Sequence, residues 1–488
     1  MSLGPFAYNM SETRYSERRA GTLVLAAILL ITFAKVIYGT SGYYFFSDDF
    51  LNFIIASDMG LTWEYLARSA QGEFIPLYRM ANWLYFNVFG LAFWPYRILL
   101  AAHQCAVVTL IASMIPCRNL RLEFLMPLLA LSALTPVFES SFQWWSAAIN
   151  VLAEALASLI AIRFACDVAP MTIRRIALST MFYTASLCFF PKGIFVAELL
   201  LSLRIFAAFE RGETYLLRGI VVAGREVWPV FAAGVAYTAI VAFGHYSSAV
   251  APPSPILLVH YIWHGWNHGF VTGLLGLDRQ FFGRVVCANL LIFGAVYLSI
   301  RRNPRTLILW AGFLIYFVVA VATIAVNRAT LLGLASSELT RYYTDISCFF
   351  VAFLIIGLSQ PGVLSDRKLH LPRFAASALA TAILSIHLLN VSAREPSVWF
   401  APGIKIETFV AQVDKSLKEA KKGTQVQDGV VPDWVMPEWT FPLREYQYFL
   451  KLFDASHVTV VPIGGPYKFD VKGRLVDAHA AGGSHLQD

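Results

Sequence analysis

The sequence predicts an all-α protein that crosses a membrane many times and carries a small α/β segment at its C-terminal end. Of its 488 residues, 57% are hydrophobic and only 14% are charged, and its mean hydropathy is +0.60. Such values are typical of repeated membrane spans rather than of soluble proteins. Apolar stretches of about twenty residues, the length of a helix that crosses a bilayer, recur along the chain. After Asn390 the composition becomes mixed, which indicates that the membrane part has ended.

We expect about eleven transmembrane helices from these stretches. Their predicted limits are 21–40, 94–115, 123–138, 147–165, 174–190, 193–209, 226–244, 283–300, 306–326, 345–359 and 374–392. The predicted organisation is a transmembrane domain over 1–392, with a long first outer loop at 41–93, followed by an extracytoplasmic appendage over 393–488. Within the appendage, helical spacing predicts a helix over 404–422, and β-branched residues predict a strand over 457–462.

The distribution of Lys and Arg predicts the orientation. Most of these residues fall on cytoplasmic segments if the N-terminus lies inside, as the positive-inside rule requires. Arg14, Arg18 and Arg19 precede a long first span, which predicts an uncleaved signal anchor. We therefore expect a multi-pass protein of the plasma (inner) membrane with its C-terminal segment outside. The net charge of +7 does not predict nucleic-acid binding, because the cations are dispersed between apolar spans.

The first outer loop carries two adjacent carboxylates, Asp48 and Asp49, among aromatic residues. One Asp would serve as a helix cap by accepting a backbone N–H, but capping does not explain the second. The loop also contains an aromatic segment at 74–86, and a similar segment follows at 256–277. We expect both to form helices that lie in the membrane interface rather than cross the bilayer.

Two cations on the predicted outer face are not explained by topology. Lys192 lies in a tight turn between two spans, and Arg341 lies just before a late span. The simpler interpretations are a solvated turn for Lys192 and an interfacial anchor for Arg341. We expect the short turn to keep the Lys192 ammonium at the membrane surface. Together with the carboxylates, the two cations would hold an anionic lipid headgroup opposite a base.

These features resemble the GT-C glycosyltransferases, which use polyprenyl-phosphate sugars as donors. The resemblance rests on the acidic pair after the first span, the long loop with an interfacial helix, and the number of spans. Phe190-Pro191-Lys192-Gly193 is similar to the Ser-Lys-Glu turn of some members, with Gly193 in place of the usual Glu. Thr340-Arg341-Tyr342-Tyr343 is similar to their Arg-Tyr motif. The resemblance covers residues 20–392 in architecture and does not extend to the appendage.

The resemblance implies an inverting transfer of a sugar to an extracytoplasmic glycan, lipid or protein acceptor. Asp48 would be the base that takes the acceptor proton, and Asp49 would be its partner, through a divalent cation such as Mg, Mn or Ca if one is bound. The residues expected to bind the donor phosphate are Lys192, Arg341, Arg328 and Tyr342. Further candidates for substrate binding are Glu73, Arg79, Gln143, Trp144 and His264.

Two other functions remain open on the sequence. Ionisable residues at His103, Glu154 and Glu198 fall within predicted spans, where they would line a proton pathway of a lipid-linked glycan transporter or flippase. An oligosaccharide ligase or polymerase differs only in the size of the donor, which the sequence does not reveal. His264 and His268 have the spacing of metal ligands, but the Trp residues between them favour an amphipathic helix. Arg204, near a cytoplasmic end, is expected to snorkel.

Overall fold

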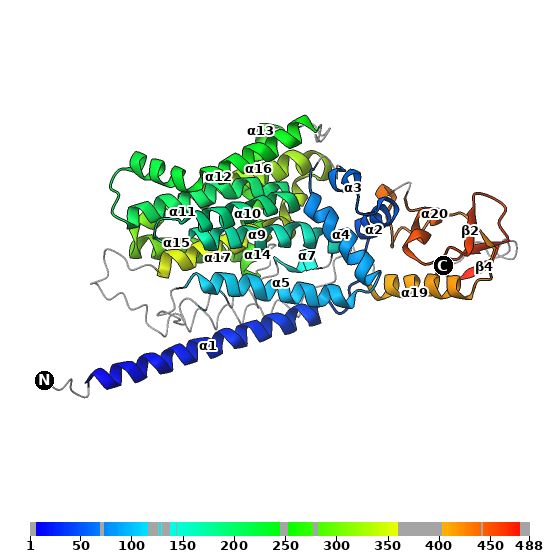
Figure 1. Ribbon diagram of the computed structural model, residues 1–488, viewed down its shortest axis with the longest axis horizontal. Coiled ribbons are helices and arrows are strands. Elements are labelled where there is room, and N and C mark those ends of the chain that lie inside the picture. The colour runs from blue at the N-terminus through cyan, green and yellow to red at the C-terminus, as the bar shows by residue number, and fades with distance from the viewer. Residues whose placement is uncertain are drawn as a thin grey trace.

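The computed structural model describes residues 6–68, 73–115, 125, 128, 137–142, 144–244, 252–276, 282–359, 403–440 and 443–478. For residues 6–20, 139–140, 331 and 439 it describes the backbone alone. The chain forms a bundle of long helices with a small α/β domain at one end (Figure 1). The N-terminus lies at the end of the bundle farthest from that domain.

The α-helices of the bundle are listed here in chain order. They are α1 (Phe6–Gly39), α2 (Asp48–Met59), α3 (Trp63–Ala67), α4 (Pro76–Phe89), α5 (Trp94–Ser113), α7 (Glu139–Phe142), α8 (Trp145–Ala147), α9 (Ala153–Ala165), α10 (Ile173–Phe189), α11 (Val196–Glu210), α12 (Leu216–Phe243), α13 (Pro255–His264), α14 (Thr272–Leu275), α15 (Phe282–Arg302), α16 (Leu307–Leu332) and α17 (Thr344–Ser359). The π-helices η2 (Ala148–Leu152) and η4 (Gly265–Val271) connect α8 to α9 and α13 to α14. The 3₁₀ turns are η3 (Pro191–Phe195), η5 (Pro304–Thr306), η6 (Leu334–Glu338) and η7 (Thr340–Tyr343).

Seven helices among the described residues are long and apolar enough to cross a membrane. They correspond to the predicted spans at 21–40, 94–115, 147–165, 226–244, 283–300, 306–326 and 345–359, as a multi-pass membrane protein requires. The helices α10 and α11 occupy two further predicted spans but have only 17 and 15 residues. The predicted span at 123–138 lies largely outside the described residues, and the span at 374–392 lies wholly outside them. The predicted number of spans is therefore not confirmed.

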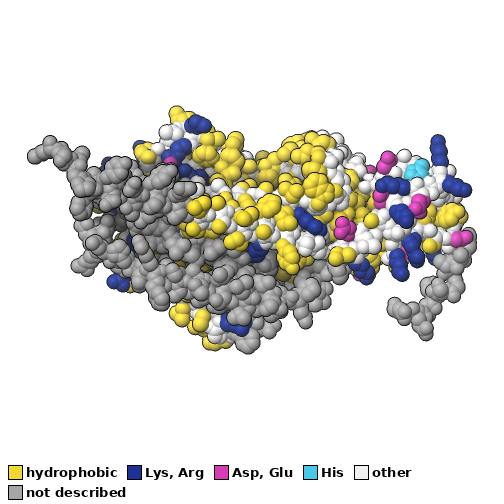
Figure 2. Space-filling model, turned by 90° about the horizontal axis from the view of Figure 1, so that it is seen from below, with side chains coloured by type: hydrophobic (Ala, Val, Ile, Leu, Met, Phe, Trp, Pro, Cys, Tyr) yellow, Lys and Arg dark blue, Asp and Glu magenta, His cyan; other side chains and the backbone are white. Residues whose placement is uncertain are grey.

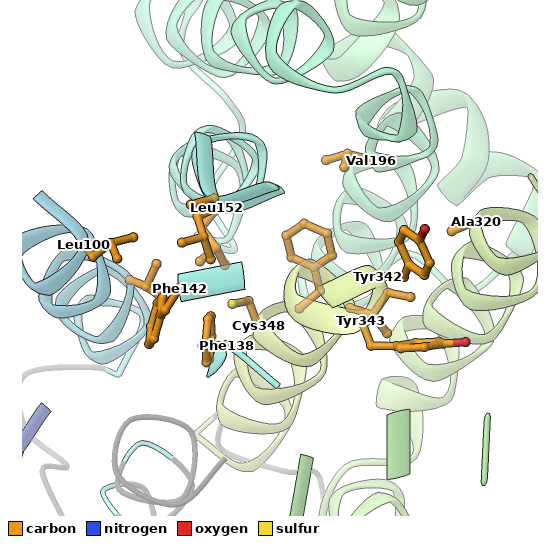
Figure 3. Close-up of a cluster of buried hydrophobic side chains, with 14 of the residues drawn as sticks. Leu100, Phe138, Phe142, Leu152, Val196, Ala320, Tyr342, Tyr343 and Cys348 are labelled. Atoms are coloured by element: carbon orange, nitrogen blue, oxygen red, sulfur yellow. The ribbon is translucent and has the colours of Figure 1, made fainter. Parts of the chain in front are cut away.

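The core of the bundle is formed around α17, whose side chains are almost all buried. Large apolar side chains of α5, α7, η2 and η7 meet it (Figure 3). On the face shown in Figure 2, hydrophobic side chains predominate over the described middle part of the bundle, with some Lys and Arg at its far end, whereas side chains of both charges gather on the C-terminal domain. This division is the one expected of a membrane part joined to a part that lies in water.

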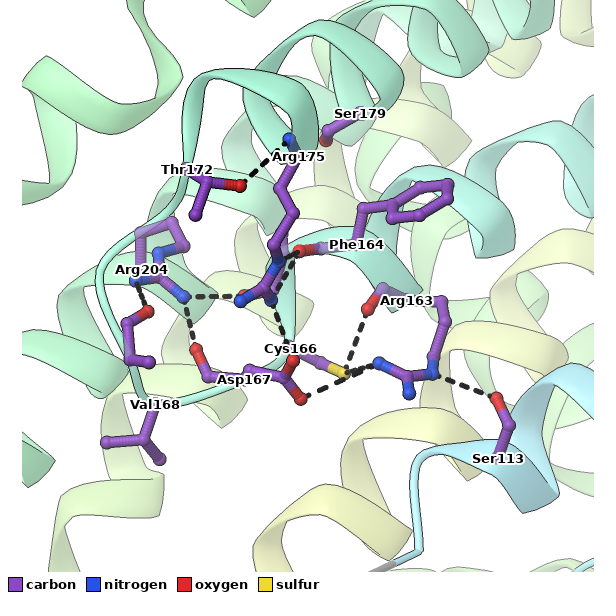
Figure 4. Close-up of polar contacts among 12 residues, drawn as sticks. Ser113, Arg163, Phe164, Cys166, Asp167, Val168, Thr172, Arg175, Ser179 and Arg204 are labelled. Atoms are coloured by element: carbon purple, nitrogen blue, oxygen red, sulfur yellow. Dashed lines mark hydrogen bonds and ion pairs between the residues drawn. The ribbon is translucent and has the colours of Figure 1, made fainter.

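At the end of the bundle that the positive charges predict to be cytoplasmic, one arginine is placed differently from the expectation. Arg204 of α11 is fully buried, so the prediction that it snorkels is wrong. Its guanidinium donates to the carbonyl oxygens of Ala165, Asp167 and Ala169 (Figure 4) and pairs with Glu226 at 2.5 Å. Arg204 thus satisfies the last carbonyl of α9 and two carbonyls of the loop that follows it. The helix α12 begins at Leu216, ten residues before the predicted span, and passes through a polar stretch that contains Glu226.

The C-terminal domain is a small α/β unit, as the sequence predicts. The helix α19 (Gly403–Glu419) packs on a four-stranded sheet of order β2-β1-β3-β4. The strands are β1 (Thr424–Gln427), β2 (Val458–Val461), β3 (Tyr467–Phe469) and β4 (Leu475–Asp477). The strand β1 is parallel to β2 and β3, and β3 is antiparallel to β4. The connection from β1 to β2 carries the short helices η8 (Glu438–Thr440), α20 (Tyr446–Phe449) and η9 (Leu450–Leu452), of which α20 and η9 lie beside α2.

Candidate active site

The two adjacent aspartates begin α2, and their side chains are in different environments. Asp49 is fully buried. Its Oδ2 accepts the backbone N–H of Phe46 at 3.0 Å, and its Oδ1 accepts both the backbone N–H and the hydroxyl of Ser146, at 2.7 and 2.6 Å. Two carboxylates in the first helical turn are also favoured by the helix dipole. Asp49 is therefore held by three hydrogen bonds, one to its own loop and two to the start of α8.

Burial of the Asp49 carboxyl raises its pKa to about 7. The hydrogen bonds from Ser146 and Phe46 act in the opposite direction, and the neighbouring charge of Asp48 adds to the rise. The loss of hydration exceeds the effect of the three donors because the group has no cation beside it in the described part of the chain. Asp49 therefore changes its charge close to neutral pH.

Asp48 is half-exposed, which makes it the carboxylate that a substrate can reach. The Ser47 hydroxyl donates to Asp48 Oδ1 at 3.2 Å, and the Asn52 amide donates to the Asp48 carbonyl at 2.6 Å. Ser47 has φ 52°, and no other non-glycine residue in the described ranges has a positive φ. Strained backbone of this kind occurs where the surrounding structure fixes it, and functional sites are frequent examples.

A buried polar network around Asn52 adjoins the two aspartates. The Asn52 amide also donates to the Tyr78 hydroxyl at 2.8 Å and to the Ser146 hydroxyl at 3.1 Å, and Arg79 Nη1 donates to Asn52 Oδ1 at 3.3 Å. Arg79 is buried under the ring of Tyr65. The predicted helix at 74–86 is thus present as α4. Its residue Arg79 is buried against Asn52 of α2 and does not lie on an open surface.

Three of the predicted site residues meet at the start of η7. The Arg341 guanidinium lies 4.7 Å from the ring centre of Trp144 and 5.2 Å from that of Tyr342, and Arg341 Nη2 is 3.5 Å from the Tyr342 hydroxyl. No carboxylate pairs with Arg341 among the residues that the structure describes. The buried indole N–H of Trp144 has no hydrogen-bond partner there either. A cation without a carboxylate partner and an N–H donor without an acceptor are thus neighbours, which is an arrangement that suits an anion.

The segment 144–146 connects this cation to the acidic pair. Trp144 stacks on Arg341, and Ser146, two residues later, donates to Asp49. Two residues of fully extended chain span at most about 7 Å between Cα atoms. Trp145 between them donates its indole N–H to Asn82 at 2.8 Å, which fixes the segment to α4. Arg341 and the aspartates therefore belong to one region at one end of the bundle.

Lys192 is placed differently from the expectation. It lies in the predicted short turn, η3, but it is buried rather than at the surface. Its ammonium pairs with Asp345 Oδ1 at 2.6 Å and donates to the carbonyl of Tyr342 at 2.9 Å. The Tyr316 hydroxyl donates to the other oxygen of Asp345, at 2.5 Å. The prediction that the ammonium stays at the membrane surface is wrong, because the first turn of α17 supplies a buried counterion.

The remaining predicted residues occupy other parts of the same end. Burial raises the pKa of Glu73 to about 7, and the positive charge of Arg328 nearby lowers it. His264 Nδ1 is 4.0 Å from Glu338 Oε1, and the rings of His264 and His268 are 5.0 Å apart. Gln143 lies outside the described residues. The predicted second interfacial segment forms α13, η4 and α14.

A protein-built site for a divalent cation does not fit these residues. Within the described ranges, no three His, Cys, Asp or Glu side chains are grouped to hold a metal ion. Asp49 uses both lone pairs of Oδ1 on the two Ser146 donors and one of Oδ2 on Phe46. Ca²⁺ takes six to eight oxygen ligands, and this pair offers too few, whereas Mg²⁺ is commonly held by one or two carboxylates together with waters and substrate phosphates. We therefore assign no step to a metal.

Sequence reasoning missed Ser146, Asn52 and Asp345. Asp345 was visible as an ionisable residue at the start of a predicted span, which by itself indicates a buried partner. Ser146 and Asn52 carry no comparable signal. No protein-family model and no curated protein sequence matches the chain. The functional assignment therefore depends on the chemistry of these side chains.

Proposed function

We propose that this protein is an inverting glycosyltransferase of the GT-C type that uses a polyprenyl-phosphate sugar as donor. The supporting observation is a connection through residues 144–146. It joins the buried Asp49, whose neighbour Asp48 is half-exposed, to an aromatic-stacked Arg341 that lacks a carboxylate partner in the described part of the chain. The acceptor is a glycan, a lipid or a protein on the extracytoplasmic side.

In the proposed reaction, Asp48 takes the proton of the acceptor hydroxyl as the new bond to the anomeric carbon forms. The bond from the anomeric carbon to the phosphate oxygen breaks, and its electron pair leaves with the polyprenyl phosphate. Arg341 stabilises the charge that grows on that phosphate. A single displacement of this kind inverts the anomeric carbon.

Asp49 and Lys192 act in support. Asp49 ties the acidic loop to Ser146 and so fixes the position of its neighbour. Lys192 holds the Tyr342 carbonyl and thereby the turn that carries Arg341. The charge of Lys192 is already paired by Asp345, so we assign the phosphate to Arg341 and retain Lys192 as the residue that positions it.

The test is turnover by the purified protein in lipid nanodiscs with a labelled polyprenyl-phosphate hexose or pentose and a panel of acceptors. Release of polyprenyl phosphate with formation of an inverted glycoside supports the proposal. The proposal would be contradicted if the protein binds the donor but neither hydrolyses it nor transfers its sugar to any acceptor. A control with Glu64→Gln changes an exposed acid of the same outer loop and is expected to retain full turnover.

One observation favours a second candidate, transport of a lipid-linked sugar. Lys192 and Asp345 form a buried ion pair, and a third ionisable side chain, Glu154, is buried close enough to interact with both. Paired charges inside a helical bundle are typical of transporters. In proteoliposomes, a transporter would move the labelled donor between leaflets without breaking the sugar–phosphate bond.

A further inference from the structure

The C-terminal domain contacts the acidic loop at the residue just before the aspartates. The backbone N–H of Ser47 donates to the carbonyl of Val435 at 3.1 Å. Along the same helix, Phe50 packs against Phe449 with ring centres 5.5 Å apart. Both phenylalanines are fully buried, so this is a packed junction and not a surface touch.

The far end of α2 is held by the same domain. Lys451 pairs with Asp58 at 2.6 Å, and the Ser57 hydroxyl donates to the Lys451 carbonyl at 3.4 Å. The contacts therefore run along α2 from its first residues to its last turn. They come from one short stretch, α20 and η9, and from the loop before it.

A second part of the domain approaches the loop closer to its start. A Cβ atom on Gly403, the first residue of α19, would lie 2.4 Å from the carbonyl oxygen of Gly42 and 2.6 Å from Tyr43 Cα. Only glycine permits this close approach of two backbones. The segment from Gly42 to Ser47 is thus held between the start of α19 and the Val435 loop.

The conformation of Ser47 needs such support. Its φ of 52° is unfavourable for a residue with a side chain, and such a conformation persists only where surrounding contacts fix it. The backbone N–H of Ser47 donates to the C-terminal domain, which is one such contact. The next residue in the chain is Asp48.

We propose that the C-terminal domain positions the acidic pair by holding Ser47 in its positive-φ backbone conformation, which sets the direction of the Asp48 carboxylate. Ser47, Val435 and Phe449 are positioning residues, and the catalytic domain of this protein is incomplete without residues 403–478. The inference rests on the proposed glycosyl transfer for its effect on turnover, but the contact itself can be measured without it.

The test compares the full-length wild-type protein in nanodiscs with Phe449→Ala, which removes the ring that packs on Phe50. The matched control is Phe453→Ala, which removes a ring that packs on Phe449 within the domain. Amide hydrogen exchange over residues 44–50 and the kinetics of sugar transfer are measured on each. We expect faster exchange and a loss in kcat of about 10²-fold with unchanged KM in Phe449→Ala only, because small misplacements of a reacting group cost about that much.

A pair of charge-reversal substitutions provides a second test if Phe449→Ala unfolds the domain. Lys451→Glu places two acids together at the end of α2, and the added change Asp58→Lys restores an opposite pair. Lys418→Glu makes the same substitution at an exposed pair on α19 and is the control. We expect Lys451→Glu to speed exchange over 44–50 and the double variant to reverse the change.

Unchanged exchange over 44–50 in both Phe449→Ala and Lys451→Glu would overturn the proposal. Faster exchange with unchanged kcat would overturn it as well, because the domain would then hold the loop without positioning the base. If the wild-type protein transfers no sugar at all, the proposed function fails. The hydrogen-exchange measurements alone then decide whether the domain holds Ser47.

Discussion

Both the backbone N–H and the hydroxyl of Ser146 donate to the same carboxylate oxygen of Asp49, at 2.7 and 2.6 Å. The two residues are 97 positions apart in the chain. Their contact joins the first outer loop to the start of the helix that runs through η2 and α9. Trp144, in the same short segment, stacks on Arg341. The region proposed as the active site is therefore assembled by one three-residue segment.

The Asp49–Ser146 contact predicts a pH dependence. Burial raises the pKa of Asp49 to about 7, so the folded protein favours its protonated form. Stability gained from this protonation is fully present below about pH 4 and is lost as the pH rises through about 7. Turnover should rise over the same range, because the ionised carboxylate is the better acceptor for its three donors.

Asp49→Asn checks this assignment. The amide cannot be ionised and presents an NH₂ group to one of the N–H donors, so we expect low turnover that is flat between pH 5 and pH 8. The melting temperature of the wild type should fall relative to that of the variant as the pH rises from about 4 to about 7. If the inflection of the turnover–pH curve near pH 7 persists in the Asn variant, it belongs to another group, such as Glu73.

Arg341 is predicted to carry donor affinity. Arg341→Ala should lower kcat/KM for the lipid donor by about ten- to hundredfold, since a hydrogen bond to a charged group contributes about 1.5–3 kcal/mol. Arg341→Lys should recover only part, because an ammonium does not stack on Trp144 or offer a planar pair of donors. Arg68→Ala, an exposed cation of the first outer loop, is the control. Equal kinetics for Arg341→Ala and Arg68→Ala would remove Arg341 from the site.

Lys192 is predicted to affect stability first. Lys192→Ala leaves Asp345 buried without its counterion, a change that typically costs about 3–5 kcal/mol. The double variant Lys192→Met/Asp345→Asn removes both charges and keeps an acceptor for Tyr316, so its thermal stability should approach that of the wild type. A stable Lys192→Ala protein with a raised KM for the donor would instead assign Lys192 to the phosphate directly.

Glycines in η4 are predicted to hold the turn that carries Arg341. A Cβ atom on Gly269 would lie 2.2 Å from the Tyr343 ring, and the Tyr343 hydroxyl donates to the Ser337 carbonyl at 2.7 Å. Gly269→Ala should therefore destabilise the protein by about 1–3 kcal/mol through overpacking. Gly294→Ala on α15, where no atom lies within 4 Å of the added Cβ, should leave thermal stability equal or higher. Equal melting temperatures would show that η4 and η7 adjust freely.

Much of the architecture was predictable because it depends on local patterns. Long apolar runs predict the spanning helices, and the aromatic segment at 74–86 predicts α4. Helical spacing predicts α19, and the β-branched run at 457–462 predicts β2. Each of these signals is contained within about twenty residues of sequence.

The contacts of the site were not predictable, because they join residues far apart. Lys192 and Asp345 are 153 positions apart, and nothing near Lys192 indicates a buried counterion. The sequence identified Asp48 and Asp49 as a pair but did not separate the buried residue from the half-exposed one. The donors from Ser146 make that difference, and a single sequence without known contacts does not reveal them.

Turnover by Asp48→Asn tests the account most directly. The amide keeps the shape of Asp48 but cannot accept the proton, and loss of a general base typically costs about 10²–10⁴ in rate. If Asp48 only begins α2, its loss would instead lower stability by about 1 kcal/mol and leave turnover intact. We predict a protein that melts like the wild type, still binds the polyprenyl-phosphate sugar and transfers it at least a hundredfold more slowly. Wild-type turnover by Asp48→Asn would contradict the proposed mechanism.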